Sequence, residues 1–109
     1  AGIEGSATLP VYATMKGALR GFAKSLAREW APLGVTVNVV SPLAYSPAMV
    51  NAIAEDPEME ERLARRVPMG RLGDPEPDVG RGIAFLVSAD AAFVTGQTLA
   101  IDGGHFMSL

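Results

Sequence analysis

The chain has 109 residues, of which 49% are hydrophobic and 19% are charged, and its formal net charge is −3. Soluble domains carry about 25% charged residues, so the composition favours a chain that packs against further material or is part of a larger domain. The charge excludes a broad basic surface for nucleic acid, and no apolar run approaches the ~20 residues of a membrane span. Without cysteine, disulfides and thiolate metal sites are excluded. No signal peptide opens the sequence, and a cytoplasmic protein is expected.

Residues 1–10 are small and aperiodic and predict a loop, and residues 11–31 then predict a helix. On that helix, apolar residues recur at steps of three or four and form one apolar stripe. The stripe consists of Met15, Leu19, Phe22, Leu26 and Trp30. Residues 35–41 (VTVNVVS) predict a short strand buried on both faces. Residues 47–66 predict a helix in two pieces, broken near Asp56 and Pro57.

A turn-rich passage follows, after which Asp78 is expected to cap a helix that reaches about Ser88. The residues expected on its inner face are Val79, Ile83, Leu86 and Val87. Residues 98–101 predict a second strand, and residues 102–104 a turn. A long helical crossover between two strands is typical of a parallel sheet. Because two strands alone are marginally stable, the fold class is predicted to be α/β, the C-terminal part of a doubly wound parallel sheet.

Tyr12 and Lys16 lie four residues apart on the first predicted helix, and therefore on the same face. A nearby cation favours the phenolate form of a tyrosine, which suits a general acid or base that acts on a carbonyl or alcohol oxygen. The spacing also recurs by chance. Taken alone, the pair is therefore better explained as an ordinary tyrosine at a helix start and a solvated lysine.

Four segments in order resemble the C-terminal half of the short-chain dehydrogenase/reductase family. They are A-G-x-x-G (residues 1–5), Y-x-x-x-K (12–16), V-N-V-V-S-P (37–42) and T-G-Q-T-L-x-I-D-G-G (95–104). The resemblance covers the chain from end to end, and the combination is far more specific than any one segment. It implies a Rossmann-like fold and hydride transfer between NAD or NADP and a carbonyl or secondary alcohol.

The resemblance also implies roles for particular residues. Tyr12 would be the catalytic acid/base, and Lys16 would favour its phenolate form and hold the hydroxyls of the nicotinamide ribose. Pro42, Leu43 and Ser46 would line the nicotinamide pocket, with Ser46 in contact with the carboxamide. The family usually has glycine where this sequence has Leu43, and Ser46 falls one position before the usual threonine. These two departures bear on the nicotinamide contacts rather than on the fold.

The sequence holds no glycine-rich phosphate loop after a strand. We therefore expect residues 1–109 to be the C-terminal segment of one domain, whose cofactor-binding half, with the family's catalytic serine and asparagine, lies upstream of Ala1. By themselves these residues are expected to be inactive. The alternative is a non-catalytic truncated or proteolysed α/β fragment held together by self-association. The single histidine, His105, has no partner at metal spacing, and no metal site is predicted.

The resemblance further implies that residues of about 44–69 form a variable lid over a small-molecule substrate. The methionines in or near this stretch, Met49, Met59 and Met69, suit an adaptable apolar pocket, although plain packing is the better explanation for any one of them. Small residues on the first helix, at positions 17, 18, 21 and 25, predict a close helix–helix contact in a homotetramer or homodimer, with a lightly covered solvent face as the alternative.

Overall fold

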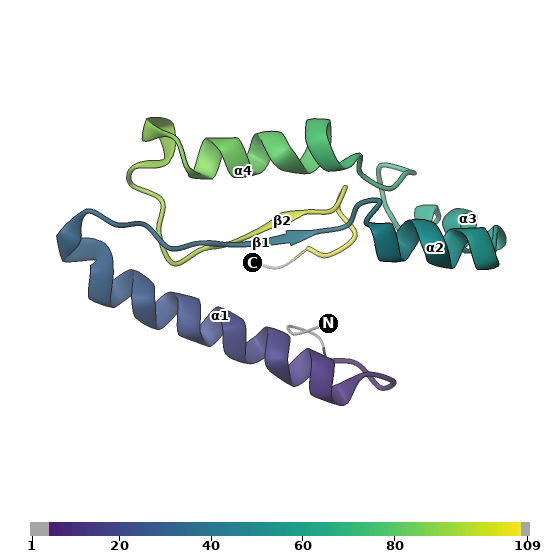
Figure 1. The fold of residues 1–109 in the computed structure, drawn as a ribbon, viewed down its shortest axis with the longest axis horizontal. Coiled ribbons are helices and arrows are strands. Elements are labelled where there is room, and N and C mark those ends of the chain that lie inside the picture. Colours follow the sequence, from purple (N-terminus) through teal and green to yellow (C-terminus); the bar gives the residue numbers. More distant parts are fainter. Residues whose placement is uncertain (1–4, 108–109) are drawn as a thin grey trace. The chain divides into compact units, whose positions relative to one another are not determined.

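The computed structural model describes residues 5–107, so that most of the first family motif, residues 1–4, lies outside the described residues. The described chain forms two compact units. The first consists of the residues up to Val39 together with Ala92–Thr98, and the second of Val40–Ala91 together with the residues from Leu99 onward. In chain order the elements (Figure 1) are α1 Pro10–Trp30, a 3-10 turn Ala31–Leu33, β1 Val39–Pro42, α2 Pro47–Glu55, α3 Glu58–Ala64, a π-helical turn Pro75–Gly80, α4 Arg81–Leu86, a 3-10 turn Ala89–Ala91 and β2 Thr98–Ile101.

Helix α1 confirms the first predicted helix, and it begins with Pro10 in its first turn, where the missing N–H of proline costs nothing. Its apolar stripe is mostly exposed. Phe22 is 61% exposed and Met15 is 67% exposed, whereas the buried residues of the helix are Ala13, Ala23 and Ala27. The small alanine face permits close approach: a Cβ placed on Gly96 would lie 3.5 Å from Ala27 Cβ.

The first half of the predicted strand over residues 35–41 is irregular, because side chains replace part of the backbone ladder there. The N–H of Val37 donates to the hydroxyl of Thr95, at 3.0 Å. Asn38 donates through its amide to Val94 O at 2.9 Å, and its amide oxygen accepts from the N–H of Gln97 at 3.1 Å. The regular strand therefore starts only at Val39.

Strands β1 and β2 form a two-stranded parallel sheet. The N–H of Val39 donates to Gln97 O at 2.9 Å, and the N–H of Leu43 donates to Ile101 O at 3.0 Å, so both strands advance in the same direction. Burial of β1 on both faces is a wrong prediction: its residues are half-buried or exposed, since β2 is its one partner among residues 5–107. The second strand and the parallel pairing are as predicted, which confirms the α/β class.

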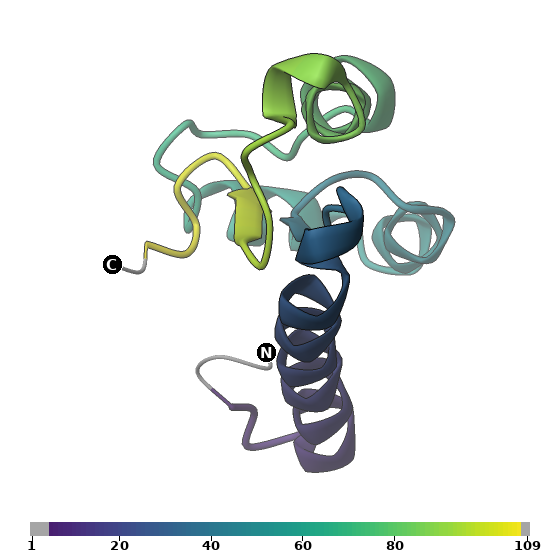
Figure 2. The same ribbon diagram turned by 90° about the vertical axis from the view of Figure 1, so that its left-hand side faces the viewer.

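Helix α4 lies along β2 in both ribbon views (Figures 1 and 2). A Cβ at Gly82 would lie 2.5 Å from Ile101 Cδ1, so a larger residue at this position would require the end of the Ile101 side chain to move. Capping by Asp78 is a wrong prediction: the helical segment starts at Pro75, so that Asp78 lies inside it. Of the predicted inner face, Val79 is buried and Leu86 half-buried, but Ile83 and Val87 are exposed.

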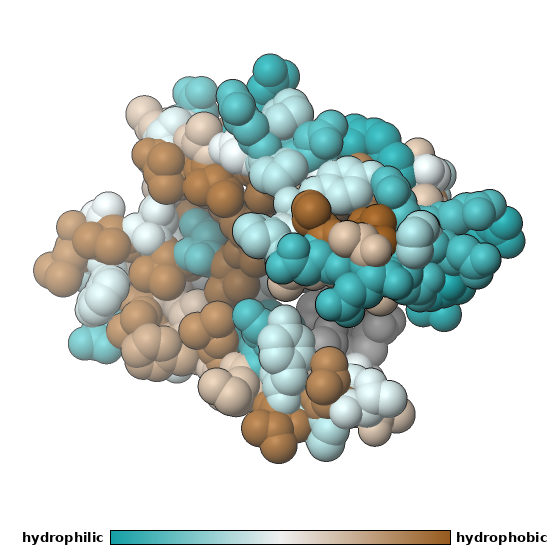
Figure 3. All heavy atoms as spheres, turned by 45° about the vertical axis from the view of Figure 1, so that its right-hand side comes forward, coloured by the Kyte–Doolittle hydropathy of each residue, from teal (hydrophilic) through white to brown (hydrophobic). Residues whose placement is uncertain are grey.

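The two-piece helix over residues 47–66 is confirmed as α2 and α3. The break falls where predicted, because Asp56 ends α2 in a non-helical conformation and Pro57 precedes α3. Hydrophilic side chains predominate on the surface over α2 and α3, which come forward in Figure 3. Several of them form ion pairs along the helix, such as Glu61 with Arg65 at 2.6 Å.

The predicted turn at residues 102–104 is also present. Asp102 closes it by accepting hydrogen bonds from the N–H of Gly104 at 3.0 Å and from the N–H of Phe106 at 2.9 Å. Gly103 has a φ of +63°, and a Cβ there would lie 2.7 Å from Val67 Cγ1. Glycine is therefore required at this position both by its backbone conformation and by the buried side chain of Val67.

Candidate functional site

Tyr12 and Lys16 lie on the same face of α1, as their spacing predicts. The ammonium nitrogen of Lys16 lies 5.3 Å from the centroid of the Tyr12 ring, which is within the range of a cation–π contact. Tyr12 is 50% exposed, so its hydroxyl is open to a molecule that binds against this face. The pair therefore presents a phenol and a cation together at an accessible surface.

The start of α1 is held by hydrogen bonds that precede and enclose Tyr12. The hydroxyl of Ser6 accepts from the N–H of Leu9 at 3.0 Å, and the N–H of Ala13 donates to Leu9 O at 3.0 Å. Thr14 donates through its hydroxyl to Pro10 O, also at 3.0 Å. Ala13, next to Tyr12, is buried. Tyr12 thus extends from an ordered first turn rather than from a loose helix end.

The loop after β1 continues as a short parallel ladder with the segment around Gly73. The N–H of Gly73 donates to Leu43 O at 3.1 Å, and the N–H of Tyr45 donates to Gly73 O at 3.0 Å. Ala44 and Gly73 form an isolated parallel bridge. Gly73 is needed for this approach, because a Cβ there would lie 3.1 Å from Leu43 O.

Leu43 is compatible with this loop in spite of the glycine that the family usually has. No described residue other than glycine has a positive φ, so Leu43 adopts an ordinary backbone conformation. Its half-buried side chain lines a hollow of about 300 Å³ together with Met69, Ala100 and Ile101. The position therefore does not require the conformational freedom of glycine. The contact of Leu43 with a nicotinamide stays a prediction.

Ser46 is the N-cap residue of α2, and its hydroxyl accepts from the N–H of Met49 at 3.2 Å. Because a hydroxyl both donates and accepts, its proton stays available to an outside acceptor. Ser46 is exposed, and Pro42 is the exposed last residue of β1. This donor set suits a carboxamide oxygen near Ser46, and the ammonium of Lys16 suits sugar hydroxyls. Each of these two residues, in its own unit, supplies a donor of the kind that its predicted cofactor contact requires, and the contacts themselves stay predictions.

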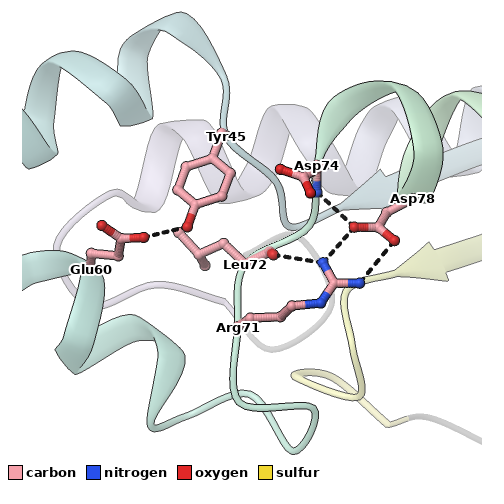
Figure 4. Close-up of polar contacts among 6 residues, drawn as sticks. All are labelled: Tyr45, Glu60, Arg71, Leu72, Asp74 and Asp78. Carbon is pink, nitrogen blue, oxygen red and sulfur yellow. Dashed lines mark hydrogen bonds and ion pairs between the residues drawn. The ribbon is translucent and has the colours of Figure 1, made fainter.

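A polar cluster that sequence reasoning missed lies beside the loop (Figure 4). Arg71 binds Asp78 through two hydrogen bonds, of 2.5 Å from Nη1 and 3.0 Å from Nη2, and also donates to Leu72 O at 3.0 Å. The N–H of Asp74 donates to Asp78 Oδ2 at 2.7 Å. The hydrogen bonds from Arg71 and then from Asp74 lower the pKa of Asp78 to about 2. Arg71 and Asp78 are seven positions apart and an irregular turn lies between them, so no periodic signal in the sequence predicts the pair.

The lowered pKa of Asp78 leads to a pH-dependence prediction. A carboxylate whose pKa is lower in the folded state stabilises the fold above its ordinary pKa of 3.8, and this contribution is lost as the pH falls to about 2. We expect Asp78→Asn to lower the denaturant midpoint at pH 7, with a difference from the unaltered protein that shrinks between pH 3.8 and about 2. Denaturant titrations at a series of pH values measure it. Glu76→Gln removes an equal charge from the same turn and is the control, and a pH-independent Asp78→Asn effect would contradict the prediction.

Tyr45 makes a second contact that sequence reasoning missed. Its hydroxyl donates a hydrogen bond to Glu60 Oε1, which brings the loop after β1 and α3 together (Figure 4). This bond to the Glu60 carboxylate raises the pKa of Tyr45 above its ordinary value. An aromatic residue in the predicted lid and a glutamate fifteen residues further on offered no spacing signal.

In residues 5–107 no group of three or more histidine, cysteine, aspartate or glutamate side chains is placed to hold a metal ion. Over the same residues, none of the helices combines the length and apolar character needed to cross a membrane.

Comparison with known proteins shows the family. A family model described as enoyl-(acyl carrier protein) reductase matches residues 1–105. The 3-oxoacyl-(acyl-carrier-protein) reductase FabG of Vibrio cholerae is 44% identical over 106 residues, which are 97% of this chain and 42% of that protein. The chain spans about 40% of the length of the curated relatives it matches.

Two solved structures are similar in fold as well. One is a short-chain dehydrogenase/reductase from Brucella melitensis, described as a glucose/ribitol dehydrogenase, with a TM-score of 0.86 and 33% sequence identity. The match covers 99% of this chain and 42% of the Brucella chain. YwfH, an NADPH-dependent reductase of bacilysin biosynthesis, has a TM-score of 0.82 at 29% identity, over 89% of this chain and 40% of its own. The chain belongs to the short-chain dehydrogenase/reductase family, and the predicted partial Rossmann-like fold is confirmed.

Proposed function

We propose that this chain belongs to an NAD(P)-dependent oxidoreductase of the cytoplasm that transfers a hydride between a nicotinamide cofactor and a carbonyl or secondary alcohol. The observation that carries the proposal is the placement of the Lys16 ammonium 5.3 Å from the ring of an exposed Tyr12. Membership of the family supports it, and so do relatives that are described as reductases and dehydrogenases.

In this proposal Tyr12 exchanges a proton with the reacting oxygen. In the direction of reduction its hydroxyl gives a proton to the carbonyl oxygen, and in the direction of oxidation its phenolate accepts the proton of the alcohol. The positive charge of Lys16 stabilises that phenolate, and the ammonium donates hydrogen bonds to the ribose hydroxyls. When bound, the nicotinamide supplies or accepts the hydride at the substrate carbon.

The loop after β1 would hold the nicotinamide ring. Pro42 and Leu43 would supply the wall, and Ser46 would donate its free hydroxyl proton to the carboxamide oxygen. The ladder between this loop and Gly73 supports the assignment, because it holds the backbone of residues 43–45 in one place. A preorganised loop binds a cofactor without first losing its own conformational freedom.

The substrate is proposed to be a small carbonyl compound or alcohol, enclosed by the lid of residues 44–69. The Vibrio cholerae relative is described as acting on a 3-oxoacyl group carried by acyl carrier protein, which makes a 3-oxoacyl thioester a rational first substrate. A homotetramer or homodimer is proposed as well. The exposed apolar residues of α1, among them Met15 and Phe22, support self-association through that helix.

Cofactor titration of the complete protein tests the proposal. We expect saturable binding of NADPH or NADH, followed by oxidation of the reduced cofactor when a 3-oxoacyl thioester or another ketone is added. Because YwfH is described as NADPH-dependent, both cofactors are needed in the comparison. Absence of binding at millimolar concentration of either one would contradict the proposal.

The alternative is a non-catalytic fragment of such an enzyme, held together by self-association. The intact mass of the purified material distinguishes the two, and it belongs in the same experiment. A species well above 11.4 kDa that binds cofactor supports the enzyme. A single species at 11.4 kDa that associates with itself and binds no cofactor supports the fragment.

A further inference from the structure

We propose that Tyr45 is a positioning residue that fixes the substrate lid to the loop after β1 through its hydrogen bond to Glu60. The proposal rests on the proposed function, because it assigns the lid and the loop to substrate and cofactor respectively. All the groups that carry it belong to the second compact unit, so that each contact lies within one body.

The main chain of Tyr45 is already anchored before its side chain makes any contact. Its N–H donates to Gly73 O at 3.0 Å, beside the parallel bridge between Ala44 and Gly73. Gly73 lies two residues after Arg71, and the guanidinium of Arg71 is bound to Asp78. The backbone of Tyr45 is therefore held by the ladder with Gly73. The segment that contains Gly73 is held in turn by the ion pair between Arg71 and Asp78.

The side chain of Tyr45 then reaches α3. The residue is half-buried, and its hydroxyl donates to Glu60 Oε1 (Figure 4). The neighbouring glutamates on α3 behave differently. Glu58 pairs with Arg62 at 3.6 Å and Glu61 pairs with Arg65 at 2.6 Å, in both cases on the helix itself or at its end. Glu60 thus differs from both in binding a residue outside its own helix.

The energetics of α3 make this one contact important. A helix of seven residues is far below the ~12–15 residues at which isolated helices become marginally stable, so tertiary contacts have to hold it in place. A hydroxyl bound to a carboxylate is a charge-assisted hydrogen bond, stronger than one between neutral groups. A phenol with the ordinary pKa of 10.0 is protonated, and hence a donor, at neutral pH, and the bond to Glu60 raises the pKa of Tyr45 further.

The backbone and the hydroxyl of Tyr45 therefore have different proposed roles. Its backbone belongs to the loop proposed to line the nicotinamide, whereas its hydroxyl controls the position of α3 in the lid. Removal of the hydroxyl should leave the backbone ladder with Gly73 intact and loosen α3. Substrate affinity should then fall while cofactor affinity is kept.

The test uses Tyr45→Phe and Glu60→Ala, singly and together, in the complete protein, with Glu61→Ala as the matched control on the same helix. We expect each test variant to raise the KM for the carbonyl substrate about three- to tenfold, the effect of roughly one hydrogen bond, with the Kd for NADPH unchanged. Hydrogen exchange of the amides of residues 58–64 should be faster. The double variant should resemble the single ones, because all three lose the same bond.

Three results of these measurements would overturn the proposed role of Tyr45. Unchanged KM and unchanged exchange in both single variants would overturn the proposal. A parallel loss of NADPH and substrate affinity would overturn it too, since it would show a general structural role. If the control Glu61→Ala produced the same changes, the specific bond between Tyr45 and Glu60 would again be refuted. Failure of the proposed function is distinguished from all of these, because the unaltered protein would then bind no cofactor.

Discussion

Replacing Tyr12 by phenylalanine is expected to lower kcat of the complete protein by about 10²- to 10⁴-fold, the usual contribution of a positioned general acid or base. The substitution deletes the hydroxyl and keeps the ring, so the contact of the ring with Lys16 is preserved. Since Tyr12 is half exposed, the change creates no cavity, and stability should be unaffected. Steady-state kinetics with a saturating ketone substrate measure the loss.

Two controls make this result specific. The Kd for NADPH should change by no more than a few-fold, because the proposed ribose contacts come from Lys16. Lys24→Ala, at another exposed position of α1, should have normal kcat, which shows that surface changes on this helix are tolerated. Substantial activity in Tyr12→Phe would remove Tyr12 from its proposed role, whatever the effect on cofactor binding.

Leu72→Ala is expected to destabilise the protein by about 2–5 kcal/mol, the range for deletion of a buried leucine side chain. Leu72 is 2% exposed and lies between Arg71 and Gly73, the two residues that hold the polar cluster and the loop ladder. Its removal leaves a cavity under both. Equilibrium denaturation of the complete protein measures the free energy of unfolding.

The matched control for this prediction is Leu33→Ala, which makes the same chemical change where the side chain is 75% exposed. Its effect should stay within about 0.5 kcal/mol, as is usual for surface positions. If the two substitutions lowered the free energy of unfolding equally, the burial of Leu72 would not be the cause of the expected destabilisation.

The sequence predicted the elements that depend on local spacing. Helix α1, the two pieces α2 and α3, the strand β2 and the turn at residues 102–104 follow from periodicity, proline and glycine, and all of them are present. That Tyr12 and Lys16 lie close to each other was predictable for the same reason, because four residues make about one helical turn. The catalytic roles of these two residues came from resemblance and stay predictions.

Burial was predicted less well than secondary structure. The stripe that contains Met15 and Phe22 is regular but exposed, and on α4 Val79 is buried while Val87 is 82% exposed. Periodicity shows which face of a helix is apolar, but it does not show what covers that face. The start of β1 was missed for a related reason, since Asn38 and Thr95 replace backbone pairing with side-chain bonds over a separation of more than fifty residues.

The sequence by itself therefore determined the order and type of the elements, the apolar faces, and the pairing of a phenol with a cation on α1. Only the tertiary structure decided that Arg71 binds Asp78, that Tyr45 binds Glu60, and that Gly103 has to be glycine. The physical reason is range. Local spacing sets which side chains share a helical turn, whereas hydrogen bonds and close approaches between segments depend on how the backbone between them folds.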